Sequence, residues 1–242
     1  MHLRSIHYCL PLGGARLADA ETELRAHAMQ SRYFELWMLG FVDPPSAAMV
    51  EALARDFPGR LIVPLRPPPA DGVAAASPRA EVSLEARLAL VDDLVRADLY
   101  LDLELRTQRP EVDAFRRHPK PTARFIVSHH DYARTPSLED LMAIASDARA
   151  VGATITKVAT LCRSPDDALR LLQFERWLTA RGQRHIVLGM GKHGVATRIF
   201  GTLWGNEFVY APVDPSRATA PGQLTRAQLE AIFAQLGSIA GA

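Results

Sequence analysis

Residues 124–158 read RFIVSHHDYARTPSLEDLMAIASDARAVGATITKV, and this stretch decides the fold. An apolar run (Arg124–Ser128) is followed by an amphipathic segment (Leu138–Val151) and then by a second apolar, β-branched run (Thr154–Val158). Short apolar runs predict buried strands, and the longer segment between them predicts a helix. Two strands joined through a helix form a right-handed unit with parallel strands. The stretch therefore predicts an α/β protein with a parallel sheet.

The same pattern repeats along the whole chain. The predicted strands are Ser5–Cys9, Tyr33–Met38, Arg60–Leu65, Leu99–Leu103, Arg124–Ser128, Thr154–Val158, His185–Leu188 and Glu207–Tyr210. The predicted helices are Leu17–Met29, Pro45–Asp56, Leu84–Arg96, Glu111–Arg117, Leu138–Val151, Pro165–Ala180, Val195–Trp204 and Arg226–Gln235. Eight strand–helix pairs in 242 residues suit a closed (β/α)8 TIM barrel, which typically needs about 250 residues. No repeat or linker divides the sequence, so we expect a single barrel domain over residues 1–242.

Helix-capping residues mark several of these boundaries. Pro45 is expected in the first turn of its helix, and Ser137 and Ser164 are expected as N-caps. Gly152 and Gly182 stand where C-terminal caps are expected.

Two segments are predicted to be long loops. One runs from Arg66 to Val82 and contains three consecutive prolines, and the other runs from Ala211 to Leu224. Both follow strands, so they belong to the face of a barrel where active sites are built. Loops of this length in a compact domain are usually functional or mobile.

Composition excludes several classes of protein. The formal net charge is +1, so nothing in the composition argues for a nucleic-acid or membrane-surface partner, and 48% hydrophobic residues are enough for a large core. No apolar stretch approaches the roughly 20 residues of a membrane span. Cys9 and Cys162 are far apart, which fits a reducing compartment, and the N-terminus lacks the pattern of a signal peptide. We therefore expect a cytoplasmic protein.

Lys157 is the most informative residue. It lies in the apolar, β-branched run ATITKVA (residues 153–159). A lysine near the end of a buried strand is costly unless it is neutral or paired, and burial lowers its pKa and yields a nucleophilic amine. This interpretation predicts a class I aldolase-like barrel that forms a Schiff base. The alternative is a lysine just past the strand end whose stem reaches solvent.

Two adjacent histidines end the strand before that lysine. His130 is a candidate acid/base because neighbouring strands would bring it close to Lys157. The pair His129-His130 also suggests a metal site, but adjacent residues on a strand face opposite sides and rarely share one ion. We therefore predict no metal and no cofactor.

Charged residues elsewhere would complete such a site. Asp102 and Glu104 share one face of their strand, where they either pair with Lys157 or form an ion pair that only orients neighbours. Arg198 follows the glycines of GMGKHG and is either a bidentate carboxylate clamp or a surface helix residue. These glycines also suggest a phosphate cradle, but neither GxGxxG nor a P-loop is present.

Four runs of sequence resemble those of type I 3-dehydroquinate dehydratases. They are FIVSHHDY (125–132), ITKVA (155–159), GMGKHGVATRIFG (189–201) and ATAPGQL (218–224), in the same order and at similar spacings. The resemblance covers most of the chain and is clearest from Leu99 onward. It implies syn elimination of water from 3-dehydroquinate to 3-dehydroshikimate, a step of the shikimate pathway toward chorismate and the aromatic amino acids. It also implies a hydro-lyase that acts as a homodimer.

The resemblance implies a role for each matching residue. Lys157 corresponds to the Schiff-base lysine, and His130 to the general base that later acts as an acid. Arg198 corresponds to the clamp for the substrate carboxylate. Thr219 and Gln223 correspond to the mobile lid. Glu35 and Arg66 correspond to the residues that contact the hydroxyl groups of the substrate.

The sequence departs from the family pattern at the groups that tune this chemistry. Trp37 stands where the family usually has an arginine, and His129 replaces a common asparagine. The strand-3 loop lacks the glutamate that supports the catalytic histidine, and Asp71 is a shorter candidate substitute. These departures keep two alternatives open: a diverged Schiff-base lyase or aldolase for another hydroxy-keto acid, or a catalytically weak binding homologue.

Overall fold

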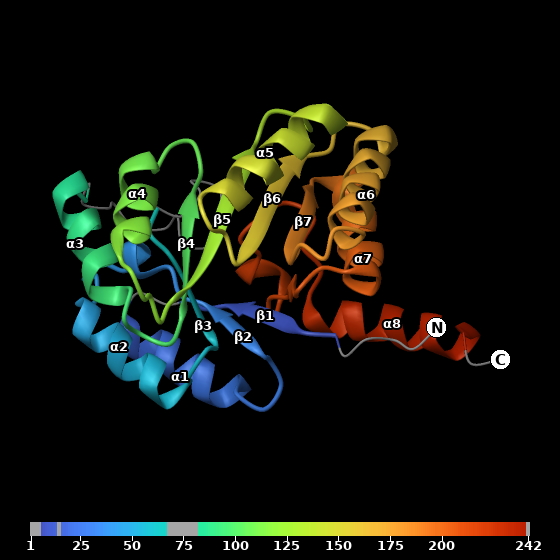
Figure 1. Ribbon diagram of the computed structural model, residues 1–242. Coiled ribbons are helices and arrows are strands. Elements are labelled where there is room, and N and C mark those ends of the chain that lie inside the picture. Colours follow the sequence, from blue (N-terminus) through green and yellow to red (C-terminus); the bar gives the residue numbers. More distant parts are fainter. Residues whose placement is uncertain (1–5, 14–15, 67–81, 241–242) are drawn as a thin grey trace.

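Eight parallel strands, each followed by a helix, curl into a nearly closed barrel with the helices outside (Figure 1). The computed structural model describes residues 6–13, 16–66 and 82–240. The strands are β1 (Tyr8–Pro11), β2 (Tyr33–Glu35), β3 (Leu61–Pro64), β4 (Tyr100–Glu104), β5 (Arg124–Asp131), β6 (Ile155–Leu161), β7 (His185–Met190) and β8 (Val209–Tyr210). The helices are α1 (Leu17–His27), α2 (Ala47–Asp56), α3 (Leu84–Leu94), α4 (Arg109–Arg117), α5 (Leu138–Ala150), α6 (Pro165–Thr179), α7 (Val195–Trp204) and α8 (Arg226–Ala240). The predicted (β/α)8 fold is confirmed.

The bounds of several strands differ from the prediction. The first strand lies about three residues later than predicted, because Cys9 pairs with Tyr33 in the ladder with β2. The second ends at Glu35 instead of Met38, since the chain turns there into a 3-10 helix at Met38–Gly40. Strands β5 and β6 both run past their predicted ends, to Asp131 and Leu161, so polar residues stay in the ladder up to the barrel mouth.

Helix capping follows the local chemistry. Ser137 and Ser164 accept hydrogen bonds from the backbone N–H groups three residues later, as predicted. Gly152 and Gly182 adopt positive φ values of 89° and 63°, which supports their predicted role as helix stops. The prediction for Pro45 is wrong: α2 begins at Ala47, because the Ser46 hydroxyl accepts from Met49 N and makes that serine the cap.

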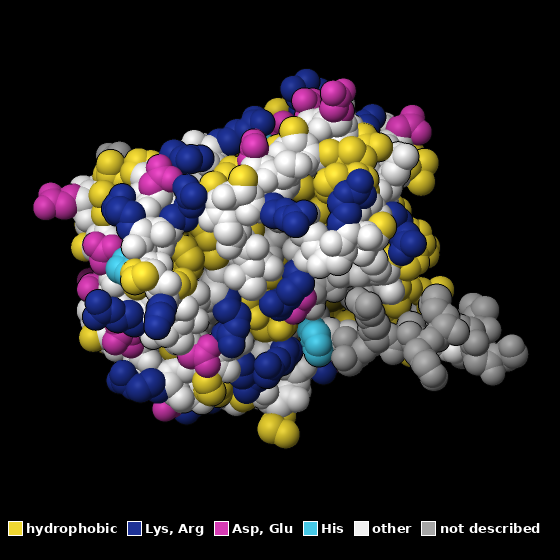
Figure 2. Space-filling view, viewed as in Figure 1, with side chains coloured by type: hydrophobic (Ala, Val, Ile, Leu, Met, Phe, Trp, Pro, Cys, Tyr) yellow, Lys and Arg dark blue, Asp and Glu magenta, His cyan; other side chains and the backbone are white. Residues whose placement is uncertain are grey.

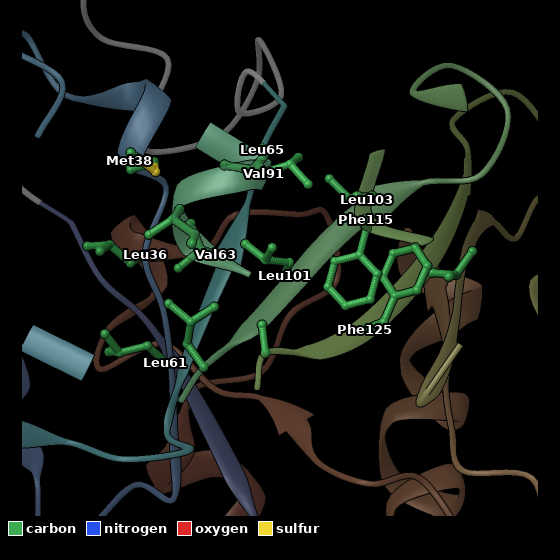
Figure 3. Packing of buried hydrophobic residues seen from close by; sticks show 14 of the residues in the cluster. Leu36, Met38, Leu61, Val63, Leu65, Val91, Leu101, Leu103, Phe115 and Phe125 are labelled. Carbon is green, nitrogen blue, oxygen red and sulfur yellow. The ribbon is translucent and has the colours of Figure 1, made fainter. Parts of the chain in front are cut away.

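The larger apolar core lies between the strands and the helices. Outward-facing residues of β3 and β4, among them Val63, Leu101 and Leu103, pack toward Val91 of α3 (Figure 3). On the neighbouring strand, Phe125 stacks on Phe115 of α4 with ring centroids 4.3 Å apart (Figure 3). These residues alternate along each strand with residues that face the barrel interior.

The barrel interior changes character from its base to its mouth. Its lower part is an apolar cluster that includes Tyr33, Tyr100 and Ile155. Because side chains two residues apart on a strand share a face, the next interior position on each of these strands is Glu35, Asp102 and Lys157. Charged side chains therefore stand on an apolar floor, in a low-dielectric setting that strengthens their interactions.

The barrel closes at β7 and β8 through one backbone hydrogen bond, from Glu207 N to His185 O at 2.9 Å, and through side chains. Among the described residues no strand ladder joins β7 to β8, and β8 pairs with β1 instead. The Asn206 side chain accepts from Val187 N at 2.7 Å and donates to Val187 O at 3.0 Å, so its amide replaces a strand partner. Higher on β7, Thr197 Oγ1 of α7 accepts from Gly189 N at 2.7 Å. Helix α7 thus seals the upper seam and places its next residue, Arg198, at the pocket.

The face shown in Figure 2 carries charges of both signs. On the face shown in Figure 2, Lys and Arg side chains are interspersed with Asp and Glu. Within the described chain, no helix is long and apolar enough to cross a membrane.

Candidate active site

A pocket at the C-terminal ends of the strands gathers the predicted site residues. It encloses about 440 Å³ of space, part of it open to solvent. Its lining includes all seven residues predicted as catalytic or substrate-binding: Glu35, Arg66, His130, Lys157, Arg198, Thr219 and Gln223. They come from three strands (β2, β5 and β6), from the loops after β3 and β8, and from α7. The closed sheet therefore brings together residues that are up to 188 positions apart in sequence.

Lys157 is buried in the pocket and paired with acids. Its side chain is 4% exposed, so the solvent-reaching alternative is wrong. Nζ donates a hydrogen bond to Asp102 Oδ2 at 2.8 Å, and Glu35 Oε1 lies 3.6 Å away. The amine also lies 4.9 Å from the centre of the Tyr210 ring. The lysine thus has two carboxylates and an aromatic face to stabilise a positive charge on its nitrogen.

Asp102 is the anionic centre of the site. Burial by itself raises the pKa of this carboxyl, but the charges of Lys157 and Arg66 outweigh it and hold the pKa well below its usual value. Each oxygen has its own cation, with Oδ2 bound to Lys157 and Oδ1 3.2 Å from Arg66 Nη1. Asp102 therefore stays ionised and joins the two cations.

His130 is oriented by Glu104. Its Nδ1 lies 2.6 Å from Glu104 Oε2, and its backbone N–H donates to Glu104 Oε1 at 3.0 Å. Burial raises the pKa of Glu104, but the contacts to His130 outweigh it and keep the carboxyl ionised. A carboxylate can only accept, so Nδ1 carries the proton. Asp102 and Glu104 therefore share a strand face, as predicted, but serve different partners.

Burial controls the charge of that histidine. Burial and the charge of Arg66 lower the pKa of His130 to about 4, against the opposing effect of Glu104. The imidazole is neutral at pH 7, which is the form a general base requires.

Arg66 lines the pocket and contacts four other side chains. Nη1 donates to Asp102 Oδ1 at 3.2 Å and to Ser128 Oγ at 3.3 Å. Nη2 lies 3.2 Å from His130 Nε2, and the guanidinium lies 5.2 Å from the centre of a Trp37 ring. This arginine therefore contacts the catalytic candidates themselves.

Trp37 fits the site as a neutral support. It is 5% exposed and lines the pocket, and its Nε1 donates to Glu35 Oε2 at 2.8 Å. The other oxygen of that carboxylate faces Lys157. The indole therefore fixes Glu35 through its N–H and contacts Arg66 through its ring, without adding a charge.

Arg198 is a buried cation whose guanidinium lacks an anionic partner among the described residues. The residue is 1% exposed, which excludes the alternative of a surface helix residue. Its Nε and Nη1 have no hydrogen-bond partner among the described residues, and burial lowers the pKa of the guanidinium to about 10. A buried charge without a partner is costly unless a ligand pairs with it. A carboxylate is the group that matches the planar guanidinium.

The β8–α8 loop covers one side of the pocket. Gln223 and Thr219 hold each other, through Thr219 N to Gln223 Oε1 at 2.8 Å and Gln223 Nε2 to Thr219 Oγ1 at 3.0 Å. Gly191 N donates to Pro221 O at 3.0 Å and so attaches the loop to the turn after β7. That the loop moves as a lid stays a prediction.

The glycines before Arg198 serve packing in the described structure. A Cβ on Gly194 would lie 2.3 Å from the backbone carbon of Gly189, so only glycine allows the turn after β7 to approach the strand this closely. This close approach accounts for glycine at these two positions without a phosphate ligand.

Three further predictions concern the histidine pair, a metal site and Asp71. His129 does not line it and lacks a hydrogen-bond partner among the described side chains, whereas His130 lines it. The described residues contain no group of three or more potential metal ligands. Asp71 lies outside the described residues, and the carboxylate that contacts His130 Nδ1 is Glu104.

The sequence analysis missed two tyrosines that line the pocket. Tyr210 ends β8, and burial followed by the charge of Glu35 raises the pKa of its hydroxyl well above the usual value. Tyr132 follows β5 and stacks on His130 with ring centroids 5.9 Å apart. Their position at strand ends was the available signal, because such residues face the mouth of a barrel.

Comparisons with known proteins agree with this geometry. The family model described as type I 3-dehydroquinase matches residues 8–240. A 3-dehydroquinate dehydratase from Desulfotalea psychrophila is 31% identical over 242 residues, covering 97% of this chain and 99% of the relative. One from Haloarcula marismortui is 35% identical over 205 residues, covering 83% and 86%.

A solved structure shows the same fold. The crystal structure of 3-dehydroquinate dehydratase from Geobacillus kaustophilus superimposes with a TM-score of 0.78 at 23% identity, covering 97% of this chain and 92% of that one. The full-length family match and the two relatives lead to one conclusion: this chain belongs to the type I 3-dehydroquinase family.

Proposed function

We propose that this protein is a type I 3-dehydroquinate dehydratase that removes water from 3-dehydroquinate through a Schiff base on Lys157. The observation that carries the proposal is the buried amine of Lys157 in one pocket with a neutral imidazole and an unpaired arginine. A ketone, an acidic α-proton and a carboxylate are the three substrate features that these groups match.

The charge pattern suits each step of the reaction. Lys157 gives up one proton to become a free amine and attacks the ketone. That proton then leaves with the carbinolamine hydroxyl as water, and a protonated imine remains. Asp102 and Glu35, which contact the Lys157 nitrogen, stabilise the positive charge of this iminium. The iminium draws electrons from the neighbouring C2–H bond and makes that proton acidic enough for a histidine base.

His130 performs the proton transfers in this proposal. Nε2 takes the C2 proton, and the resulting enamine expels the hydroxyl group at C1, which leaves as water with a proton from the same imidazolium. Water then hydrolyses the product imine and frees Lys157. Arg198 holds the carboxylate at C1 throughout, which fixes the ring relative to His130. Thr219 and Gln223 would close over the bound substrate and exclude bulk water.

Trapping the imine tests the proposal directly. Purified protein is incubated with 3-dehydroquinate and sodium borohydride, digested and analysed by mass spectrometry. We expect the reduced ligand on the peptide that contains Lys157, and none on Lys157→Met. Turnover is followed in parallel by the absorbance of the conjugated product. Absence of both an adduct and product at saturating substrate would refute the assignment.

The structure weakens one alternative and leaves a reason to test the other. A catalytically weak binding homologue was motivated by the missing glutamate of the strand-3 loop, but Glu104 supplies a carboxylate to His130. A diverged enzyme for another hydroxy-keto acid is motivated by Trp37, which gives the hydroxyl side of the pocket an indole wall. Comparing kcat/KM for 3-dehydroquinate with that for other hydroxy-keto acids distinguishes the two substrates.

We also propose that the protein is a homodimer and that it is cytoplasmic. Phe200 and Trp204 of α7 are both more than a third exposed and pack on each other at 5.4 Å, and Leu169 of the adjacent α6 is 63% exposed. A second copy would bury this apolar surface. Light scattering should give the mass of a dimer and, for Trp204→Glu, that of a monomer.

Both cysteines are free and buried, which supports a reducing compartment such as the cytoplasm.

A further inference from the structure

The two ring nitrogens of His130 have different partners, which fixes the tautomer of the ring. Nδ1 faces Glu104 Oε2 at 2.6 Å and must donate, because the ionised carboxylate only accepts. A neutral imidazole carries one proton, so Nε2 is the bare, basic nitrogen. The atom 3.2 Å from Nε2 is Arg66 Nη2, which only donates. The lone pair that would accept the substrate proton is therefore occupied by Arg66.

Arg66 is held in this position from three sides. Asp102 Oδ1 and Ser128 Oγ accept from its Nη1, and the Trp37 ring covers its face at 5.2 Å. Asp102 does not depend on Arg66 for charge balance, since its second oxygen binds Lys157 at 2.8 Å. The Arg66 contacts are therefore made by groups that remain paired when the guanidinium moves.

We propose that Arg66 caps the basic nitrogen of His130 in the empty pocket and releases it when the hydroxyl groups of a polyhydroxylated keto acid draw the guanidinium away. The inference rests on the proposed function for the identity of that ligand. Arg66 is thus a positioning residue that acts through His130, and Trp37 positions Arg66. The base becomes available only when the pocket is occupied, which protects the resting site from unproductive protonation.

Several charged groups act on His130 at once. Glu104 and Asp102 face it from β4, Arg66 from the end of β3, Lys157 from β6, and Tyr132 stacks on it from the end of β5. Arg66 and Lys157 lower the pKa of His130, and Glu104 raises it. Of the two cations, Arg66 is the one in direct contact with Nε2, so its departure should change both the proton affinity and the hydrogen bond of that nitrogen.

Nitrogen-15 NMR of histidine-labelled protein tests the resting state without any turnover. The chain has eight histidines, and His130→Gln assigns the resonances. We expect the Nδ1–H tautomer at neutral pH in the free protein. Arg66→Met should raise the pKa of His130 by about 1 to 3 units, the range that a charge at this distance produces. Arg66→Lys keeps the charge and should restore most of the difference.

A matched control separates this contact from the general effect of charge. Arg134 is an arginine at the same end of the barrel, but its side chain is 72% exposed. Arg134→Met should leave the pKa and the tautomer of His130 unchanged. Protonation of Nε2 in the neutral free protein, or an equal pKa of His130 in wild type and Arg66→Met, would overturn the proposal.

The borohydride-reduced adduct on Lys157 tests the release. Filling the pocket should shift the pKa of His130 upward in the wild type, and by a smaller amount in Arg66→Met, where nothing caps Nε2 beforehand. Equal shifts in the two proteins would show that Arg66 does not leave. If no adduct forms, the proposed function fails while the NMR result for the free protein still decides whether Nε2 is capped.

Discussion

Glu104→Gln is the substitution that most sharply tests how the base is held. Both oxygens of Glu104 accept hydrogen bonds from His130, one from Nδ1–H and one from the backbone N–H. A glutamine has one acceptor oxygen and one donor nitrogen, so it satisfies one of these two donors and confronts the other with its own NH₂ group. Either the backbone contact breaks or the imidazole changes to the Nε2–H tautomer, in which the catalytic nitrogen has no lone pair.

The size of the effect follows from the same geometry. His130 has a pKa of about 4 and is already neutral at pH 7, so loss of the Glu104 charge changes little in its protonation. The decrease in kcat must therefore come from a wrong tautomer or a wrong orientation of the His130 imidazole. A wrongly held tautomer costs up to about 10⁴-fold, and an absent acid/base costs about 10²–10⁴-fold. We expect a decrease in kcat of that order, equivalent to about 3–5 kcal/mol on the barrier.

The assay separates imine formation from elimination. Product absorbance gives kcat, and borohydride trapping gives the fraction of Lys157 that forms an imine. Glu104→Gln should still form the imine while elimination slows. Asp131→Asn is the control, because it makes the same chemical change one residue past His130, where Asp131 Oδ1 accepts from the rim backbone N–H groups of Ala133 and Arg134. A kcat for Glu104→Gln within a few-fold of wild type would refute the tautomer argument.

Four other outcomes are expected. His130→Ala should form the trapped imine but eliminate water about 10²–10⁴-fold more slowly, and unimpaired turnover would remove His130 from the mechanism. Arg198→Met should lower kcat/KM about 10-fold or more, because the charge-assisted hydrogen bonds to the substrate are lost. It should also raise the melting temperature, because the protein without ligand loses an unpaired buried charge. A lower melting temperature would contradict this account. His130 titrates near pH 6.5 in the unfolded chain and near pH 4 in the native protein, so the unfolded state binds more protons between these two pH values. The free energy of unfolding should therefore fall by about 3 kcal/mol as the pH drops from 7 to 4. Urea titrations should show this pH dependence in wild type and a weaker one in His130→Gln. Asp71→Asn should leave the pH–rate profile unchanged, because Glu104 already holds Nδ1 of His130.

Much of the fold followed from local sequence patterns. Alternation of apolar runs with amphipathic segments is repeated eight times, and burial of both faces of a parallel strand makes this pattern visible without coordinates. The caps at Ser137 and Ser164 were predictable because capping is a contact between residues three positions apart. Pro45 failed as a predicted start because Ser46 competes for the same helix end with a side-chain acceptor.

The sequence by itself determined which groups are present and on which strand each one stands. It identified a lysine in an apolar run and two acids on one strand face, because strand periodicity assigns side chains to faces. The tertiary structure decided how these groups are paired. The amine of Lys157 binds Asp102, Glu104 binds His130, and Arg66 bridges the two pairs, through contacts between residues 26 to 64 positions apart. Such pairing depends on barrel closure, strand register and burial, and no local pattern in the sequence encodes those distances.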